Sequence, residues 1–166
     1  VAYQKYQGVT LTSKGFHLAK MIVRKHRLWE VFLVDKLHFS WDEVHEVAEQ
    51  LEHIKSKKLT AELDAFLKFP TEDPHGDPIP DAMGNMPSYQ KLLLAKVKQS
   101  QRCICVGVKD STPKFLQYLD KHKIALGTEI TVLSRESYDE SMAVKINNIQ
   151  RSISKEVAHN LYVKIA

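Results

Sequence analysis

Proline is the feature that most limits how this chain can fold, because five of its six prolines fall within residues 70–87. Proline lacks a backbone N–H and fixes φ, so this block cannot form a long helix or a central strand. The block also holds four acidic residues and no Lys or Arg. We interpret it as a linker that divides the 166-residue chain into two parts.

The composition of the chain is that of ordinary globular domains. Hydrophobic residues make up 43% and charged residues 27%, which excludes wholesale disorder. No apolar run approaches the ~18 residues of a membrane helix, and residues 1–13 do not resemble a signal peptide. Cys103 and Cys105 are too close in sequence for an easy disulfide, which favours reduced thiols and the cytoplasm. The net charge of +4 permits a polyanionic partner without requiring one.

Three helices are predicted before the proline block. The first covers residues 13–36, with Thr12 or the next serine as its N-cap. The second opens at an S-x-x-E capping box, residues 40–43. The third covers residues 57–68 and is stopped by the first proline of the block. A turn signal within residues 3–11 predicts a short hairpin ahead of them.

Histidine and glutamate residues share faces on the first two predicted helices. On the first helix, His26 and Glu30 lie one turn apart. On the second, spacings of four, seven and eight residues place four more on one stripe: His45, Glu49, Glu52 and His53. Imidazole nitrogens and carboxylate oxygens bind divalent transition ions, and two facing helices could bring them together. We therefore expect one ion between His26, Glu30 and His45, and a second between Glu49, Glu52 and His53.

The ligand types of this set favour Mn²⁺ or Fe²⁺ over a thiolate zinc site, because no cysteine is among them. Its carboxylates repel one another without a cation, so we expect the metal-free site to be loose. A simpler alternative stays open. A helix face rich in Glu and His is commonly a solvated face, and His26 in the run R-K-H-R would then be one more cation on a basic surface.

Enzyme motifs do not accompany these residues. The sequence has no paired E-x-x-H motifs, no H-E-x-x-H, no phosphate-binding loop, no G-x-G-x-x-G and no G-x-S-x-G. The spacing of His45, Glu49 and His53 only superficially resembles that of a zinc protease. The sequence therefore gives no positive signal for catalysis.

The part after the proline block reads as several short strands with little helix. Strands are predicted at residues 101–108, 129–133, 142–146 and 161–165, with a helix at 113–122 and one helical turn after Ser154. This pattern suggests a small SH3-like β-barrel, which makes the whole chain an α+β protein. The two cysteines are expected to be a buried strand thiol and its same-face neighbour rather than ligands.

Separated blocks of the sequence resemble one known family. They are K-H-R-L-W-E at residues 25–30, W-D-E-V-H at 41–45, E-H at 52–53 and G-D-P-I-P at 76–80, after a stretch at 6–15 that looks like the wing of a winged helix. In order and spacing they resemble the diphtheria toxin repressor family. Its members are metal-activated bacterial transcriptional repressors, including iron-dependent repressors and manganese transport regulators. The resemblance covers the whole chain.

The resemblance implies roles for the ligand candidates. His26, Glu30 and His45 match the family's ancillary metal site, and Glu52 and His53 match two ligands of its primary site. Where the diphtheria branch has a cysteine, this chain has Glu49, as the manganese regulators do. A carboxylate in place of a thiolate shifts preference toward Mn²⁺, with Fe²⁺ kept open and Zn²⁺, Co²⁺ or Ni²⁺ able to substitute. The third domain of the longer repressors lends a ligand to the ancillary site, and its counterpart here would be Asp110.

The resemblance also implies a domain plan. Residues 1–14 would be the remnant of a winged-helix DNA-binding domain, and residues 15–69 the helical metal-binding and dimerisation domain. The proline-rich linker would cover residues 70–92. Residues 93–166 would form an SH3-like domain related to one found in ferrous-iron transport proteins. The family's recognition helix, and the first-helix side chain that completes the primary site, have no counterpart, so we expect the chain to be a fragment.

The expected function is that of a metal-dependent DNA-binding repressor of metal-ion homeostasis, cytoplasmic and not an enzyme. Its expected partners are a second copy of the chain and, for the intact parent protein, operator DNA; no membrane partner is expected. Lys5 and Lys14 of the wing could touch phosphate. Dimerisation candidates, which could equally be intradomain core, are Leu51, Ile54, Leu59, Leu63 and Phe66.

Two other classes of function are weighed against the regulator. A metal-dependent helical-bundle enzyme would need an open coordination position beside a substrate pocket. A metal-independent interaction module built on the SH3-like domain would be indifferent to loss of His26 or His45. Saturable metal binding by a dimer without turnover would separate the regulator from both.

Overall fold

The computed structural model describes residues 2–4, 8–88 and 90–166, with side-chain detail from residue 10 onward. It divides into two compact units. The N-terminal unit consists of residues 1–73 and 78–88, and the C-terminal unit of residues 74–77 and 89–166. Each unit is described by itself.

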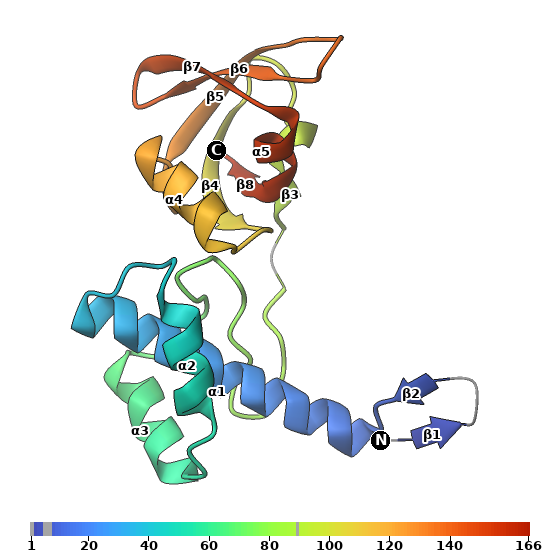
Figure 1. Cartoon of the computed structure of the whole chain (residues 1–166), viewed down its shortest axis with the longest axis vertical. Coiled ribbons are helices and arrows are strands. Elements are labelled where there is room, and N and C mark those ends of the chain that lie inside the picture. Colours follow the sequence, from blue (N-terminus) through green and yellow to red (C-terminus); the bar gives the residue numbers. More distant parts are fainter. Residues whose placement is uncertain (1, 5–7, 89) are drawn as a thin grey trace. The chain divides into compact units, whose positions relative to one another are not determined.

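The N-terminal unit opens with a short antiparallel pair followed by a long helix (Figure 1). Strands β1 (Ala2–Gln4) and β2 (Gly8–Thr10) pair antiparallel where the sequence predicts a hairpin, and the residues that join them lie outside the described part of the chain. Helix α1 (Ser13–Leu37) begins where the sequence predicts, because the Thr12 hydroxyl accepts a hydrogen bond from the backbone N–H of Gly15 at 3.2 Å. It ends where His38 adopts a left-handed conformation.

Two shorter helices complete the helical part. Helix α2 (Val44–Glu52) starts later than predicted, so the assignment of Ser40 as its N-cap was wrong. The Glu43 carboxylate does accept a hydrogen bond from the Ser40 N–H at 3.2 Å, but residues 41–43 form a turn rather than helix. Helix α3 (Lys57–Phe66) matches the prediction closely and is capped by the Ser56 hydroxyl.

The core of this unit lies along the C-terminal half of α1 only. One buried cluster joins α1 to α3 and to the proline block: Leu28, Val31, Leu63 and Ile79. A second joins α1 to α2: Leu33, Val44 and Ala48. The first buried residue of α1 is Arg24, and the helical residues before it project beyond α2 and α3 (Figure 1). None of the helices in the described part of the chain has the length and apolar character to cross a membrane.

The proline block is ordered by contacts rather than by regular structure. Residues 70–87, all of which the structure describes, form no helix or strand beyond one isolated bridge. Within the N-terminal unit, the backbone N–H of Ile79 donates to Thr71 at 2.9 Å. The Arg24 guanidinium donates to the carbonyl of Pro80 at 2.7 Å, and that of Arg27 to the carbonyl of Pro78 at 2.5 Å. Residues 78–80 of the proline block are thus held against α1.

Residues 74–77 belong to the C-terminal unit and lie against one of its strands. The His75 carbonyl accepts a hydrogen bond from the Val108 N–H at 2.9 Å. Gly76 has φ +80°, and a Cβ there would lie 2.1 Å from the carbonyl oxygen of Val106. Only glycine fits this close approach of two backbones.

The rest of the C-terminal unit is an antiparallel sheet of six strands in the order β3-β8-β4-β5-β6-β7 (Figure 1). The strands are β3 (Leu92–Leu93), β4 (Arg102–Val108), β5 (Glu129–Arg135), β6 (Met142–Ile146), β7 (Ile149–Ile153) and β8 (Leu161–Ile165). Helices α4 (Pro113–Lys121) and α5 (Lys155–Asn160) and the 3-10 turn η1 (Leu94–Lys96) complete it. The chain is therefore α+β, as the sequence predicts.

Strand β7 is the one longer strand that the sequence analysis missed. It pairs with β6 through a two-residue loop, Asn147 and Asn148, both of which have positive φ. Two left-handed residues at a hairpin tip are the geometry of a type I′ turn, for which asparagine is well suited. The signal was present in the sequence as an Asn-Asn pair after a strand.

The two cysteines of β4 are both fully buried, on the same face of the strand. Burial raises the pKa of each thiol from 9.0 to about 11, and for Cys103 the neighbouring Cys105 adds to the effect. Neutral, enclosed thiols have neither the charge nor the access of metal ligands.

Candidate metal centre

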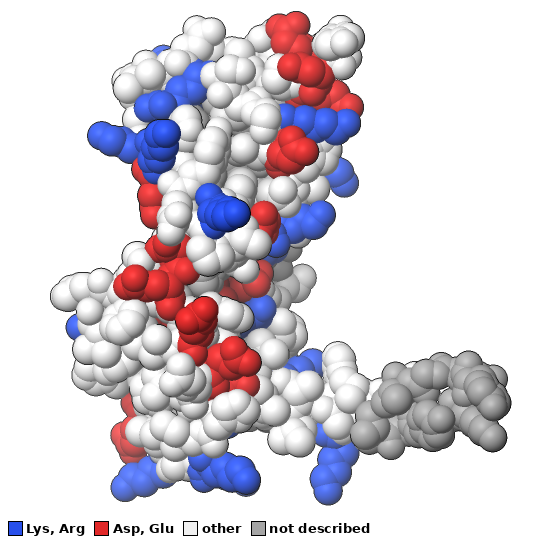
Figure 2. Space-filling view, viewed as in Figure 1, with Lys and Arg blue, Asp and Glu red and all other residues white. Residues whose placement is uncertain are grey.

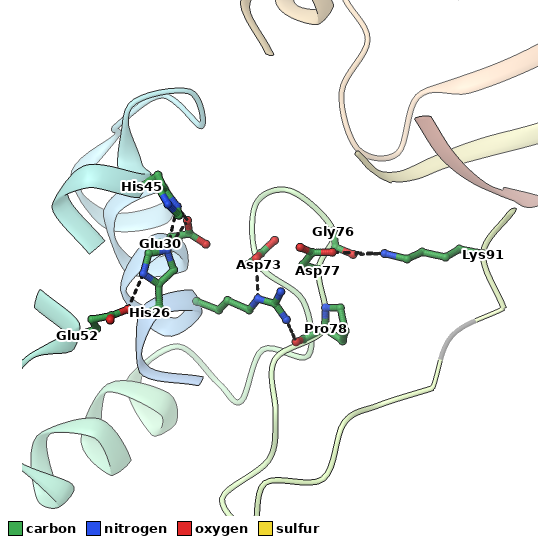
Figure 3. A network of polar contacts seen from close by, with 10 residues as sticks. His26, Glu30, His45, Glu52, Asp73, Gly76, Asp77, Pro78 and Lys91 are labelled. Atoms are coloured by element: carbon green, nitrogen blue, oxygen red, sulfur yellow. Dashed lines mark hydrogen bonds and ion pairs between the residues drawn. The ribbon is translucent and has the colours of Figure 1, made fainter. Parts of the chain in front are cut away.

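The predicted ligands of the first set meet where α1 and α2 pack together. His26 and Glu30 lie one turn apart on α1, and His45 lies in the first turn of α2. Val44 of α2 is buried against α1, and this contact fixes where the two helices cross. The next residue, His45, therefore lies over the face of α1 that bears His26 and Glu30. Figure 3 shows the three side chains pointing toward one another.

Three donor atoms of this group form a compact triangle. The Nε2 atom of His26 lies 3.1 Å from Oε1 of Glu30 and 3.1 Å from Nδ1 of His45. The third side, from His45 Nδ1 to Glu30 Oε1, is 3.4 Å. Ligands held about 2.1 Å from one ion in tetrahedral or octahedral geometry are separated by roughly 3.0–3.4 Å. The residues present therefore fit a small divalent cation.

Burial makes the triangle asymmetric. The side chain of Glu30 is 3% exposed and that of His26 14%, whereas that of His45 is 70% exposed. A buried carboxylate facing two imidazole nitrogens calls for positive charge beside it, from a protonated ring or from a cation. The exposed side, at His45, leaves an open path from solvent.

Glu52 approaches His26 from the other side of the ring. Its Oε2 atom lies 2.8 Å from Nδ1 of His26, so each nitrogen of this imidazole faces a carboxylate (Figure 3). Burial lowers the pKa of His26, but hydrogen bonds and charge from Glu30 and Glu52 together outweigh it and raise the pKa above 6.5. A carboxylate on the outer nitrogen of a metal-binding histidine fixes the tautomer and orientation of the ring.

The second predicted set is not brought together in the same way. Glu49 and His53 are both exposed, with His53 as the C-cap of α2. Within the described part of the chain, no convergent group of three ligands includes either residue. Figure 2 shows acidic side chains gathered over α2 on this face of the molecule. The second site stays a prediction.

Basic residues beside His26 have contacts that the sequence analysis did not foresee. Arg24 is buried, with its guanidinium 2.5 Å from the carboxylate of Asp64 on α3. Arg27 pairs with Asp73 at 3.4 Å. Lys25 donates hydrogen bonds to backbone carbonyls at the end of α2. The run R-K-H-R is therefore not an open basic surface. Its signal in the sequence is four consecutive polar residues, which must point to different sides of one helix.

The remaining predicted site residues are not among the donors of this triangle. Asp110 belongs to the C-terminal unit, where its carboxylate accepts a hydrogen bond from the Thr112 N–H at 2.9 Å. Lys14 is exposed in the first turn of α1, and Lys5 lies outside the described residues.

The dimerisation candidates divide into two groups by burial. Leu63 is buried in the core between α1 and α3, and Leu51 packs against the core between α1 and α2. Ile54, Leu59 and Phe66 are exposed apolar side chains. The exposed three are the most accessible to a second copy of the chain.

Comparison with known proteins agrees with this picture. Residues 12–81 match the family described as iron dependent repressor, metal binding and dimerisation domain, and residues 92–165 match the FeoA domain. A solved structure of a manganese-dependent transcriptional repressor in complex with manganese superposes with a TM-score of 0.88 at 37% identity. It covers 95% of this chain and 76% of that one.

Several curated relatives match less than half of this chain. The iron-dependent repressor IdeR of Mycobacterium tuberculosis is 46% identical over 70 residues, which are 42% of this chain and 30% of that protein. A probable metal transport system membrane protein of Chlamydia trachomatis is 45% identical over 71 residues, 43% of this chain and 16% of that protein. The chain thus spans less than a third of the length of these relatives.

The fold and the site together define a class, the metal-binding and dimerisation domain of a metal-dependent repressor joined to a FeoA domain. The chain belongs to the diphtheria toxin repressor family, which comprises transcriptional repressors and not enzymes. Membership bears out the resemblance predicted from the sequence.

Proposed function

We propose that this chain is the metal-sensing and dimerising part of a DNA-binding repressor that controls metal-ion homeostasis. The observation that carries the proposal is the triangle of donor atoms from His26, Glu30 and His45 at 3.1–3.4 Å. Membership in a family of metal-dependent repressors supports it. The proposed partners are a second copy of the chain and operator DNA, in the cytoplasm.

The proposed ion is Mn²⁺ or Fe²⁺, with Zn²⁺, Co²⁺ or Ni²⁺ able to substitute. The donors are nitrogen and oxygen, and the carboxylate of Glu49 stands where a thiolate would favour softer ions. A manganese-dependent relative among the solved structures supports the preference for Mn²⁺. We assign Glu49, Glu52 and His53 to a second, primary site, and keep Asp110 as a candidate ligand from the C-terminal unit.

The domain plan is part of the proposal. Residues 1–14 would be a wing remnant and 15–69 the metal-binding and dimerisation domain. Residues 70–92 would be the linker and 93–166 the SH3-like domain. The hairpin of β1 and β2 would be the wing, with Lys5 and Lys14 against phosphate. We also propose that the six-stranded sheet curls into an SH3-like barrel.

The mechanism is a shift between two arrangements of α1 and α2. His26, Glu30 and His45 would hold the ion, which would supply positive charge between α1 and α2. The protein itself positions two of these donors: Glu52 contacts the ring of His26, and the core beside Val44 places His45 over α1. Only the difference in affinity between two arrangements can move their equilibrium. Any movement of α1 carries the segment held by Arg24 and Arg27 with it.

Dimerisation would use the exposed apolar side chains of the helical unit. Ile54, Leu59 and Phe66 lie on or beside α3, and their exposed apolar side chains would be covered by the second copy. Leu51 and Leu63 would support this surface from the core.

Calorimetric titration with Mn²⁺, Fe²⁺ and Zn²⁺ tests the proposal on chelator-stripped protein. Saturable binding is expected, and the double variant His26→Ala/His45→Ala should abolish binding at the triangle. His17→Ala is the matched control, because His17 is an exposed histidine of the same helix. Unchanged binding in the double variant would overturn the assigned site. A dimer by light scattering that forms without regard to metal would favour the interaction-module alternative.

A further inference from the structure

Helix α2 leaves carbonyl groups without an intrahelical partner at its C-terminal end, as every α-helix does. It has nine residues, and its last turn contains no basic residue. The last carbonyl groups of a helix have no partner within the helix and carry partial negative charge, so they need a donor from elsewhere. In this protein the donor comes from α1. The ammonium group of Lys25 donates to the carbonyl of Glu52 and lies 3.5 Å from that of Ile54.

Glu52 is thereby held at both of its ends by consecutive residues of α1. Lys25 binds its backbone carbonyl, and the next residue, His26, faces its carboxylate at 2.8 Å. The backbone contact sets where the residue sits, and the side-chain contact sets where its carboxylate points. With the carbonyl released, the end of α2 is free to fray, and the carboxylate loses its fixed approach to the His26 ring.

We propose that Lys25 is a positioning residue for the metal centre. It touches no donor atom of the triangle, and it acts through Glu52 on the ring of His26 and on the donors at the end of α2. This inference rests on the proposed metal-binding function. Charge alone predicts the opposite effect: a fixed positive charge near a cation site repels the cation, so its removal should tighten binding.

The test compares Lys25→Met with Lys20→Met in Mn²⁺ titrations followed by electron paramagnetic resonance. Methionine keeps most of the apolar stem of lysine and removes the charge and the donors. Lys20 is the matched control, because it lies on the same helix with its ammonium over the Phe16 ring. Loss of an outer partner of a metal ligand typically weakens binding 10–100-fold, so we expect roughly tenfold weaker binding for Lys25→Met. Lys20→Met should leave binding unchanged.

A second comparison separates positioning from a merely structural role. If Lys25 acts through Glu52, Lys25→Met adds no further loss of affinity to Glu52→Gln. If it only stabilises the fold, the two losses multiply. Tighter or unchanged Mn²⁺ binding in Lys25→Met would overturn the inference, as would a multiplied loss in the double variant.

A metal-free measurement keeps the inference independent of the proposed function. The nitrogen-bound proton between His26 and Glu52 should exchange with solvent faster in Lys25→Met than in the parent protein, by nuclear magnetic resonance. An unchanged exchange rate contradicts the role of Lys25. If the parent protein binds no Mn²⁺, the proposed function fails, and this exchange measurement alone decides whether Lys25 positions Glu52.

Discussion

Removal of Asp64 should destabilise the N-terminal unit by an amount that the structure lets us estimate. The Arg24 and Asp64 side chains are 6% and 11% exposed, and their charged atoms are 2.5 Å apart. Asp64→Ala leaves the guanidinium buried without its counter-charge, which costs about 3–5 kcal/mol in comparable pairs. The carbonyl of Pro80 still accepts one hydrogen bond from Arg24, so we expect the lower end, about 3 kcal/mol.

Tryptophan fluorescence in a urea titration is the assay. Both tryptophans, Trp29 and Trp41, belong to the N-terminal unit, so the signal follows that unit and not the sheet. With an m-value of about 1.5 kcal/mol/M, a loss of 3 kcal/mol lowers the midpoint by about 2 M urea. The C-terminal unit, followed by circular dichroism, should keep its own midpoint.

Two further variants decide whether burial of the pair is the reason. In Arg24→Met/Asp64→Leu no charge is left unpaired, so most of the lost stability should return. Glu140→Ala removes an ion pair of the C-terminal unit that is of similar length, 2.6 Å, but about half exposed. It should hardly move the transition of that unit, followed by circular dichroism. A midpoint within 0.5 M (about 0.75 kcal/mol at that m-value) of the parent for Asp64→Ala would refute the reasoning. A double variant as unstable as the single one would refute it too.

Three other outcomes are expected. Gly76→Ala should lower the melting temperature of the C-terminal unit far more than Gly127→Ala, by calorimetry. Both have positive φ, but a Cβ at Gly127 meets no atom within 4 Å, and equal shifts would contradict the clash with Val106. The two thiols of β4 should resist a thiol reagent at pH 8 until urea unfolds the sheet. Because their folded pKa is raised from 9.0 to about 11, the stability they contribute is complete below pH 9 and is lost as the pH rises toward 11, which urea midpoints across this range measure. Mn²⁺ should slow amide exchange within residues 26–53 in mass spectrometry, and exchange indifferent to the ion would argue against a loose metal-free site.

Local signals in the sequence predicted most of the helices and strands. The start of α1 depends on one hydrogen bond, from the Gly15 N–H to the Thr12 hydroxyl, so the threonine alone is enough to predict it. The start of α2 depends on more than its capping box. Ser40 and Glu43 do make their contact, yet the helix begins at Val44, whose side chain is buried against α1. A tertiary contact decided between two local possibilities.

The metal centre shows the same division between local and distant causes. The pairing of His26 with Glu30 follows from helical spacing, and His45 follows once the two helices are taken to face each other. The partner of Arg24 could not be predicted, because Asp64 is forty residues away and on a different helix. The hydrogen bond from Lys25 to the end of α2 could not be predicted for a further reason. Its acceptor is a backbone carbonyl, which every residue has, so the type of residue does not reveal it.

The N-terminal half of α1 extends well beyond the metal centre, so a change at the centre can move residues far from it. From His26 to Ser13 the helix extends thirteen residues, about 20 Å, and none of that stretch before Arg24 is buried. This half of α1 is held only at one end, where the helix crosses α2. If α1 tilts by about 5° at this crossing, its N-terminal end near Ser13 moves by roughly 1.7 Å. The apolar side chains along this half of α1, among them Phe16 and Leu18, would travel with it. A small change of angle between α1 and α2 at the metal centre would thereby become, at the far end of α1, a displacement large enough to make or break a packed contact.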